Sequence, residues 1–350
     1  MTEKIDFRSM TPEELVEYLA TMGEPKYRAA QLFSKLQNGT PLMEISNLSL
    51  KLRSTLSERE LDTLPRVEKK LVSRIDGTVK YLFRLYDGEC IESVFMRYKH
   101  GNTLCISSQV GCRMGCRFCA STLAGRVRNL LPSELVGQII AAELDTGEHI
   151  SNVVMMGIGE PLDNYDNVVR FLRLVNHPDG LNIGYRHISL STCGVVPRIY
   201  ELAEVDIPIT LSISLHAATD ERRSEIMPVN NKWGIDELLS ACVAYYKKTG
   251  RRISFEYTLI HGKNDSDKDA LALANLLTRA FKGTGAPIHV NLIRVNEVRE
   301  TGFRHGTQES ANRFSDILNR NGCVATVRRR LGSDVNAACG QLRRSTTNND

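Results

Sequence analysis

The sequence predicts an α/β fold: a partial barrel of six βα units that follows a small N-terminal helical domain and a linking antiparallel β-meander. Three observations support this. Residues 11–57 contain only short helical patterns, residues 68–97 contain three β-rich runs, and from residue 103 strand-like and helix-like segments alternate. Repeated βα units imply a parallel sheet, and six of them suit an open or partial barrel.

The N-terminal helices are predicted from a start signal. Thr11-Pro12-Glu13-Glu14 forms a capping box with proline at the first helical position, which favours a helix from residue 12 to residue 23. Shorter helices are expected at 26–36 and 49–57.

The meander is predicted from its turns. Asp76-Gly77 and Asp87-Gly88 separate three β-rich runs, and Asp-Gly is a strong hairpin signal. The expected strands are 68–74, 78–85 and 90–97.

The barrel elements follow in order. Strands are expected at 103–109, 152–156, 187–191, 209–215, 253–260 and 288–293, and helices at 133–144, 164–175, 197–203, 236–248, 268–281 and 309–319. We therefore divide the chain into a helical accessory domain (1–66), the meander (67–97), the barrel core (98–333) and a C-terminal segment (334–350) with a disordered tail. Sites in such barrels lie at the C-terminal ends of the strands.

The composition narrows the class of protein. The chain has 350 residues, 42% of them hydrophobic and 25% charged, with a formal charge of +4. It has no apolar run of membrane-spanning length, and its polar N-terminus does not resemble a secretory signal, so we expect a cytoplasmic protein. Its nine cysteines are an odd number, which argues against a secreted disulfide framework and favours metal binding or chemistry.

Three of these cysteines form a tight loop after the first barrel strand. Cys112, Cys116 and Cys119 have the spacing CxxxCxxC. Structural zinc normally takes four ligands, and no second knuckle is present. Three thiolates on a four-iron cluster leave one iron open, and the amino and carboxylate groups of S-adenosylmethionine suit that iron. The loop therefore favours a radical-generating 4Fe-4S cluster, with zinc or inert thiols as the alternatives.

Longer motifs in three segments carry a family resemblance. They are Cys105-Ile-Ser-Ser-Gln-Val-Gly-Cys112 with the loop that follows, Gly157-Ile-Gly-Glu160-Pro-Leu-Asp-Asn164, and Asp334-Val-Asn-Ala-Ala-Cys339-Gly-Gln-Leu. Together they resemble the RlmN/Cfr family of radical S-adenosylmethionine RNA methyltransferases, over essentially the whole chain. The resemblance implies that the barrel is of the radical S-adenosylmethionine type.

The resemblance also implies roles for particular residues. Cys339 would be the cysteine that is methylated, Cys105 its resolving partner in a transient disulfide, and Glu92 the proton acceptor. The S-adenosylmethionine contacts would be Gly159, Glu160, Ser191, Ser214, Leu215, His216 and Asn296. Considered one at a time, most of these residues could have a structural role as readily as a functional one. We assign Cys90, Cys193, Cys242 and Cys323 to buried positions without a chemical role.

The implied activity is methylation of C2 of an adenine in 23S ribosomal RNA, with transfer RNA as a second substrate. It would consume two S-adenosylmethionine molecules per turnover and need a reductant such as flavodoxin, in a monomeric enzyme. The RNA backbone would be held by the N-terminal helices and by basic clusters at residues 113–128, 247–252 and 328–344. Two alternatives remain: C8 methylation of the Cfr type, and a non-catalytic zinc-dependent RNA-binding protein.

Overall fold

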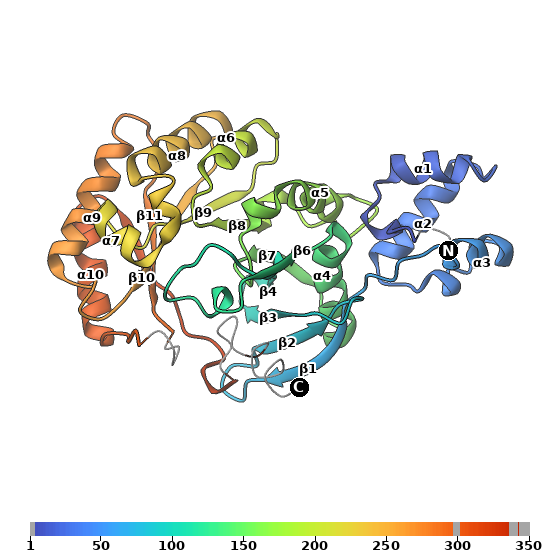
Figure 1. Cartoon of the computed structure of the whole chain (residues 1–350), viewed down its shortest axis with the longest axis horizontal. Helices are drawn as coiled ribbons and strands as arrows, with labels where there is room; N and C mark the ends of the chain where they lie inside the picture. Colours follow the sequence, from blue (N-terminus) through green and yellow to red (C-terminus); the bar gives the residue numbers. More distant parts are fainter. Residues whose placement is uncertain (1–3, 297–301, 336–341, 343–350) are drawn as a thin grey trace.

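The fold is an α/β barrel that is open on one side, with helices on its outside and a small helical domain beside it (Figure 1). The computed structural model describes residues 4–296, 302–335 and 342. Its main sheet has ten strands in the order β1-β2-β3-β4-β7-β8-β9-β10-β11-β12. The predicted fold class is confirmed.

The N-terminal domain contains α1 (Pro12–Ala20), α2 (Tyr27–Gln37) and α3 (Leu50–Ser57). The predicted capping box starts α1, because Thr11 Oγ1 accepts from Glu14 N at 3.3 Å and Glu14 Oε2 accepts from Thr11 N at 2.9 Å. The helix ends at Ala20, three residues before the predicted end.

The meander consists of β1 (Arg66–Val72), β2 (Val79–Arg84) and β3 (Cys90–Tyr98), paired antiparallel. It is continuous with the barrel, because β3 also pairs antiparallel with β4 (Gly101–Cys105), the first barrel strand. In that register Val94 lies opposite Cys105. Side chains of β3 therefore reach the same face of the sheet as Cys105.

Seven strands run parallel, one more than predicted. They are β4, β7 (Ile150–Met155), β8 (Ile188–Thr192), β9 (Thr210–Ser214), β10 (Ile253–Leu259), β11 (His289–Arg294) and β12 (Val324–Val327). The additional strand, β12, is four residues long, and none of them is fully buried. It is also shorter than the other six parallel strands.

The helices between these strands are close to those predicted. They are α4 (Pro132–Thr146), α5 (Tyr165–Asn176), α6 (Val196–Glu204), α8 (Ile235–Thr249), α9 (Asp267–Ala280) and α10 (Gln308–Arg320). Their apolar faces and the outer face of the sheet form one hydrophobic core. A short helix, α7 (Asp220–Ile226), was not predicted.

The predicted strand at 103–109 was wrong in its second half. After β4 ends at Cys105, the chain forms β5 (Gln109–Gly111), which pairs with β6 (Arg126–Asn129) in a separate two-stranded sheet. This hairpin brackets the cysteine loop.

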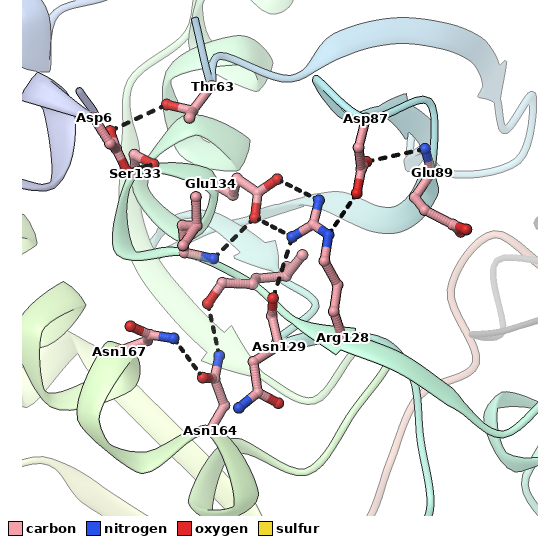
Figure 2. A network of polar contacts seen from close by, with 12 residues as sticks. Asp6, Thr63, Asp87, Glu89, Arg128, Asn129, Ser133, Glu134, Asn164 and Asn167 are labelled. Carbon is pink, nitrogen blue, oxygen red and sulfur yellow. Dashed lines mark hydrogen bonds and ion pairs between the residues drawn. The ribbon is translucent and has the colours of Figure 1, made fainter. Parts of the chain in front are cut away.

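A polar network joins the hairpin to the meander and the N-terminal domain to α4 (Figure 2). Arg128 donates to both carboxylate oxygens of the fully buried Glu134, at 2.7 and 2.8 Å, and to Asp87 at 2.6 Å. Ser133, beside Glu134, donates to Asp6 at 2.7 Å. Because breaking a buried pair leaves an uncompensated charge, Arg128 has a structural role here.

No helix in the described part of the chain is long and apolar enough to cross a bilayer.

Candidate active site

A cavity of about 390 Å³ opens at the C-terminal ends of the parallel strands. Most residues proposed from the sequence line it: Cys105, Cys112, Cys116, Cys119, Gly159, Glu160, Ser191, Ser214, His216 and Asn296. They come from five segments that are far apart in the sequence, and the barrel brings these segments together. Cys339 lies outside the described residues.

The cysteine loop is held from two sides. Cys112 N donates to Gly125 O at 2.9 Å, which attaches the loop to the hairpin. Arg117 N donates to Ile226 O at 2.9 Å, at the end of α7. Gly111 permits the first contact, since it has a φ of +77° and a Cβ there would lie 1.9 Å from Gly125 O. The loop therefore presents its thiols from a fixed backbone.

The three thiols suit an iron–sulfur cluster. Burial raises the pKa of Cys112 to about 12. Burial also raises the pKa of Cys116, and the neighbouring Cys119 and Cys112 sulfurs raise it further. Buried thiolates need a cation, and soft sulfur donors favour iron–sulfur clusters. Within the described ranges, no three His, Cys, Asp or Glu side chains converge on a single-ion site. A four-iron cube is larger, and each thiolate binds a separate iron.

Asp163 connects the cysteine loop to the second motif. It forms ion pairs with Arg113 (Nη2–Oδ1 2.5 Å) and Arg126 (Nη1–Oδ2 3.1 Å), and it accepts from Gln109 Nε2 at 2.9 Å. Burial alone would raise the pKa of Asp163, but the hydrogen bonds from Arg113 and Gln109 hold it below its usual value. Gln109 Oε1 in turn accepts from Glu160 N at 2.9 Å. The two motifs are thus one hydrogen-bonded unit.

Glu160 is a buried carboxylate fixed by backbone donors. Leu162 N donates to Oε1 at 3.0 Å and Cys193 N donates to Oε2 at 2.8 Å. Burial raises the pKa of Glu160. Glu160 lines the cavity, so its carboxylate is placed to accept from a ligand ammonium there.

Gly159 is required by a close backbone approach. Its φ is +107°, and a Cβ would lie 2.6 Å from Gln109 Cβ and 2.7 Å from Gln109 N. Gly159→Ala is expected to lower the affinity for S-adenosylmethionine by about tenfold. The added methyl group must displace Gln109 and Glu160, and such overpacking costs ~1–3 kcal/mol. Isothermal titration of the anaerobic protein measures the loss.

The matched control for this variant is Gly283→Ala. Gly283 also has a positive φ, +76°, but a Cβ at this position would meet no other atom within 4 Å. Gly283→Ala therefore introduces the same backbone strain as Gly159→Ala but no steric clash. Equal losses of affinity in the two variants would contradict the role of close packing at Gly159.

His216 is a neutral hydrogen-bond donor in the cavity wall. It lies just past β9 with a φ of +59°, and its Nδ1 accepts from Thr258 N at 2.9 Å. Since a backbone N–H can only donate, the ring proton must be on Nε2. Burial, with a smaller effect of Arg223, lowers the pKa of His216 to about 3. The imidazole therefore cannot serve as a cationic group near neutral pH.

This lowered pKa predicts a pH dependence of stability. The unfolded chain takes up the proton below about pH 6.5 while the folded chain does not, so stability falls as pH drops, by about 1.4 kcal/mol per unit. Between about pH 7.5 and about pH 5.5 the melting temperature should fall further for the wild type than for His216→Asn, since asparagine tolerates positive φ and does not titrate there. Parallel curves for the two proteins would refute the assignment.

The remaining predicted contacts divide into two groups. Ser191 on β8 and Ser214 at the end of β9 line the cavity, and Asn296 lines it as an exposed residue. Leu215 does not line it, because its side chain is in the main hydrophobic core. Its N–H donates to Glu256 O at 3.1 Å, so only its backbone is near the strand ends.

The four cysteines assigned to buried positions are indeed buried. Cys193 differs from the other three, because it also lines the cavity and its N–H orients Glu160.

Glu92 lies behind the cavity wall. It forms an ion pair with Lys80, Nζ–Oε2 3.1 Å, and both side chains are 1% exposed. It is on the same face of β3 as Val94, which packs on Cys105. On this face, Leu342 packs against Leu82 and Cys90. The meander therefore supports Cys105 and Glu92 on one surface.

Arg223 on α7 was missed from the sequence. Its side chain is fully buried and donates to the carbonyls of Cys193 (2.6 Å), Ser214 (3.2 Å) and Leu215 (3.1 Å). It therefore joins the ends of β8 and β9. Because its neighbours in the sequence are charged, it looks like a surface arginine in the sequence, and only the position of α7 in the fold shows that it is buried.

The geometry defines a class of protein. Three thiols follow the first parallel strand of a partial barrel, and polar groups at the next strand ends face them. This is the arrangement of a radical S-adenosylmethionine enzyme, and the model of the Radical SAM superfamily matches residues 106–274.

Comparison with known proteins identifies the family. A chain from Alkaliphilus oremlandii (strain OhILAs), named "Probable dual-specificity RNA methyltransferase RlmN", is 53% identical over 348 residues, which are 99% of this chain and 100% of that one. A Clostridium botulinum (strain Eklund 17B / Type B) protein of the same name is 52% identical over 96% of this chain and 95% of its own. The crystal structure of a radical SAM methyltransferase from Sphaerobacter thermophilus has a TM-score of 0.89 at 40% identity, covering 96% of this chain and 98% of its own. The chain belongs to the RlmN family.

Proposed function

We propose that this chain methylates C2 of an adenine at the peptidyl-transferase centre of 23S ribosomal RNA, and of the adenosine beside the anticodon of transfer RNA. The observation that carries the proposal is that Cys105 lines the same cavity as Cys112, Cys116 and Cys119. A radical centre alone requires only the three loop cysteines. Of the two others that line the cavity, Cys193 has a structural role, because it packs beside Cys116 and its N–H donates to Glu160, whereas Cys105 packs beside Val94 and Leu331. The "dual-specificity" name of the relatives supports two RNA substrates.

The cysteine loop would hold one 4Fe-4S cluster, and Glu160 with the strand-end groups would hold S-adenosylmethionine. When bound, this pair supplies a carbon-centred radical that removes hydrogen from an unactivated methyl group. Such chemistry is needed because C2 of adenine, between two ring nitrogens, is electron-poor and resists polar transfer from a sulfonium methyl.

The residues of the chain would perform the other steps. Cys339 takes a methyl group from one S-adenosylmethionine, and a second molecule is consumed in activating that methyl. The activated carbon bonds to C2, the resulting adduct would give up its one unpaired electron to the cluster, and Glu92 or Cys105 removes the C2 proton. The Cys105 sulfur then attacks the Cys339 sulfur: an S–S bond forms, the S–CH₂ bond breaks, and its electron pair leaves with carbon, which gains a proton. A reductant such as flavodoxin supplies electrons to the cluster.

The support for Glu92 is its environment. Glu92 lies 3.1 Å from Lys80 Nζ, on the face of β3 that also carries Val94, which packs on Cys105. Described residues on either side of Cys339 in the sequence contact the meander: Leu342 packs on Leu82, and Asp334 accepts from Ser73 Oγ at 2.7 Å. We also propose that the enzyme is a monomer in the cytoplasm.

One experiment tests the proposal. The anaerobically reconstituted protein is incubated with methyl-deuterated S-adenosylmethionine and unmodified fragments of ribosomal RNA or transfer RNA. We expect 2-methyladenosine whose methyl group keeps two of its three deuteriums, with the third in deoxyadenosine. Methylation at C8 would instead support the Cfr-type reaction. A protein that contains zinc without iron and makes no methyladenosine would support the RNA-binding alternative.

A further inference from the structure

The mouth of the cavity is crossed by residues 328–333, here called the strap. The strap leaves β12 at one edge of the main sheet and reaches the turn between β1 and β2 at the other (Figure 1). Arg328 N donates to Leu292 O at 2.8 Å at its start, and Gly332 N donates to Asp76 Oδ2 at 2.9 Å near its end. Between these points, Leu331 packs beside Cys105. The strap is therefore anchored at both ends and in its middle.

The strap carries three consecutive arginines that line the cavity and are exposed to solvent. Arg328 approaches Met156 Sδ at 3.9 Å. Arg329 and Arg330 have no hydrogen bond or ion pair to any side chain in the described ranges. Two uncompensated guanidinium groups thus stand at the entrance to a site whose buried carboxylates, Glu160 and Glu256, lie deeper.

The arginines near the cysteine loop differ in this respect. Arg113 and Arg126 pair with Asp163, and Arg128 pairs with Asp87 and Glu134. Their charges are already balanced within the protein. Arg117, on the loop itself, has an exposed side chain with no hydrogen-bond or ion-pair partner among the described residues, but none of these four arginines lines the cavity. Of the two clusters, only the strap lines it, so the charges at the mouth that are available to a ligand are those of the strap.

The chemistry of the strap fits an RNA backbone. Guanidinium groups bind phosphate through paired hydrogen bonds. A base can react inside the cavity only if it is unstacked and turned out of its loop. Its flanking phosphates then stay at the mouth, where Arg329 and Arg330 lie.

We propose that Arg329 and Arg330 bind the phosphates beside the turned-out adenosine and so hold the RNA at the cavity mouth. This inference rests on the proposed function, since it takes RNA to be the substrate. It assigns the backbone contacts to the strap and not to the arginines around the cysteine loop.

The test is the double variant Arg329→Gln/Arg330→Gln in the reconstituted holoenzyme. Its affinity for an unmodified ribosomal RNA fragment is measured at several salt concentrations. We expect affinity to fall about tenfold, and the slope of log K against log salt to decrease by roughly 1.4, which is about 0.7 for each single-strand phosphate contact. KM for RNA should rise with kcat unchanged.

The matched control is Arg279→Gln/Lys282→Gln, which removes the same net charge. Both residues are exposed and lie around the end of α9, which leads into the start of β11 at the opposite rim of the barrel. Affinity and salt slope should stay as in the wild type. Equal losses in both double variants would overturn the inference in favour of a general charge effect.

The remaining outcomes separate this inference from the proposed function. If the wild type methylates RNA and the strap variant keeps its affinity, salt slope and KM, the inference is wrong and the proposed function stands. If the wild type binds RNA through the strap but transfers no methyl group, the inference stands and the proposed function is wrong.

Discussion

Cys116→Ala is expected to abolish both iron–sulfur absorbance and deoxyadenosine formation. Cys116 is buried on the cysteine loop and packs in one hydrophobic cluster with Ile226 and Met227. Losing one of three thiolates leaves two irons without a protein ligand, and no described cysteine stands on the loop to replace it. Iron and sulfide content, absorbance and deoxyadenosine yield are measured after anaerobic reconstitution.

The control for this variant is Cys242→Ala. Cys242 is fully buried in α8 and belongs to the main core, so the change also removes a buried thiol. It should cost some stability while the cluster still assembles. If Cys116→Ala retained the iron content and deoxyadenosine yield of the wild type, the assignment of the cysteine loop to the cluster would be wrong.

Cys105→Ala is expected to stop the reaction after a single RNA has been attacked. The variant keeps the cysteine loop and can still form the bond between Cys339 carbon and C2, but it lacks the sulfur that would break the S–CH₂ bond. Protein and RNA should therefore remain covalently joined, with less than one product per enzyme. Denaturing electrophoresis with labelled RNA, followed by mass spectrometry of the digested adduct, detects this state.

Cys323→Ala serves as the comparison for Cys105→Ala. Cys323 is buried beside β12 and does not line the cavity. This variant should turn over repeatedly without an adduct. Repeated turnover of Cys105→Ala with no adduct would remove Cys105 from the proposed reaction, while the cluster assignment would be unaffected.

Much of the fold could be predicted because local signals agreed with the final structure. The capping box at Thr11, the Asp-Gly turns and the apolar runs of β7 to β11 mark elements that form where their sequence favours them. The position of the cysteine loop after the first parallel strand then placed the site at the correct end of the barrel.

The elements that were not predicted were missed for one physical reason. Tertiary contacts stabilise them, and their local sequence pattern does not. The helix α7 has seven residues and is held by Arg223, whose partners are carbonyls on two separate strands. The edge strand β12 has no fully buried residue. The break after Cys105 follows from the pairing of β5 with β6, twenty residues apart in the chain at Gln109 and Asn129.

The site was predicted from residue types, but their internal partners were not. The sequence shows Arg113, Arg117, Arg126 and Arg128 as a basic cluster, whereas the structure pairs all of them except Arg117 with a carboxylate. Glu92 was expected to be a proton acceptor, and its buried contact with Lys80 depends on the register of β2 and β3. Such pairings depend on distance in space and have no signature in sequence spacing.

The strap is the last wall of the cavity to be synthesised. Every other described lining residue lies at or before Asn296, whereas the strap begins at Arg328. A chain leaves the ribosome from its N-terminus, so the cysteine loop and the strands β4 to β11 emerge before the strap does. The mouth of the cavity therefore acquires this wall only when the strap has reached Asp76, after the cysteine loop and the strand ends are in place.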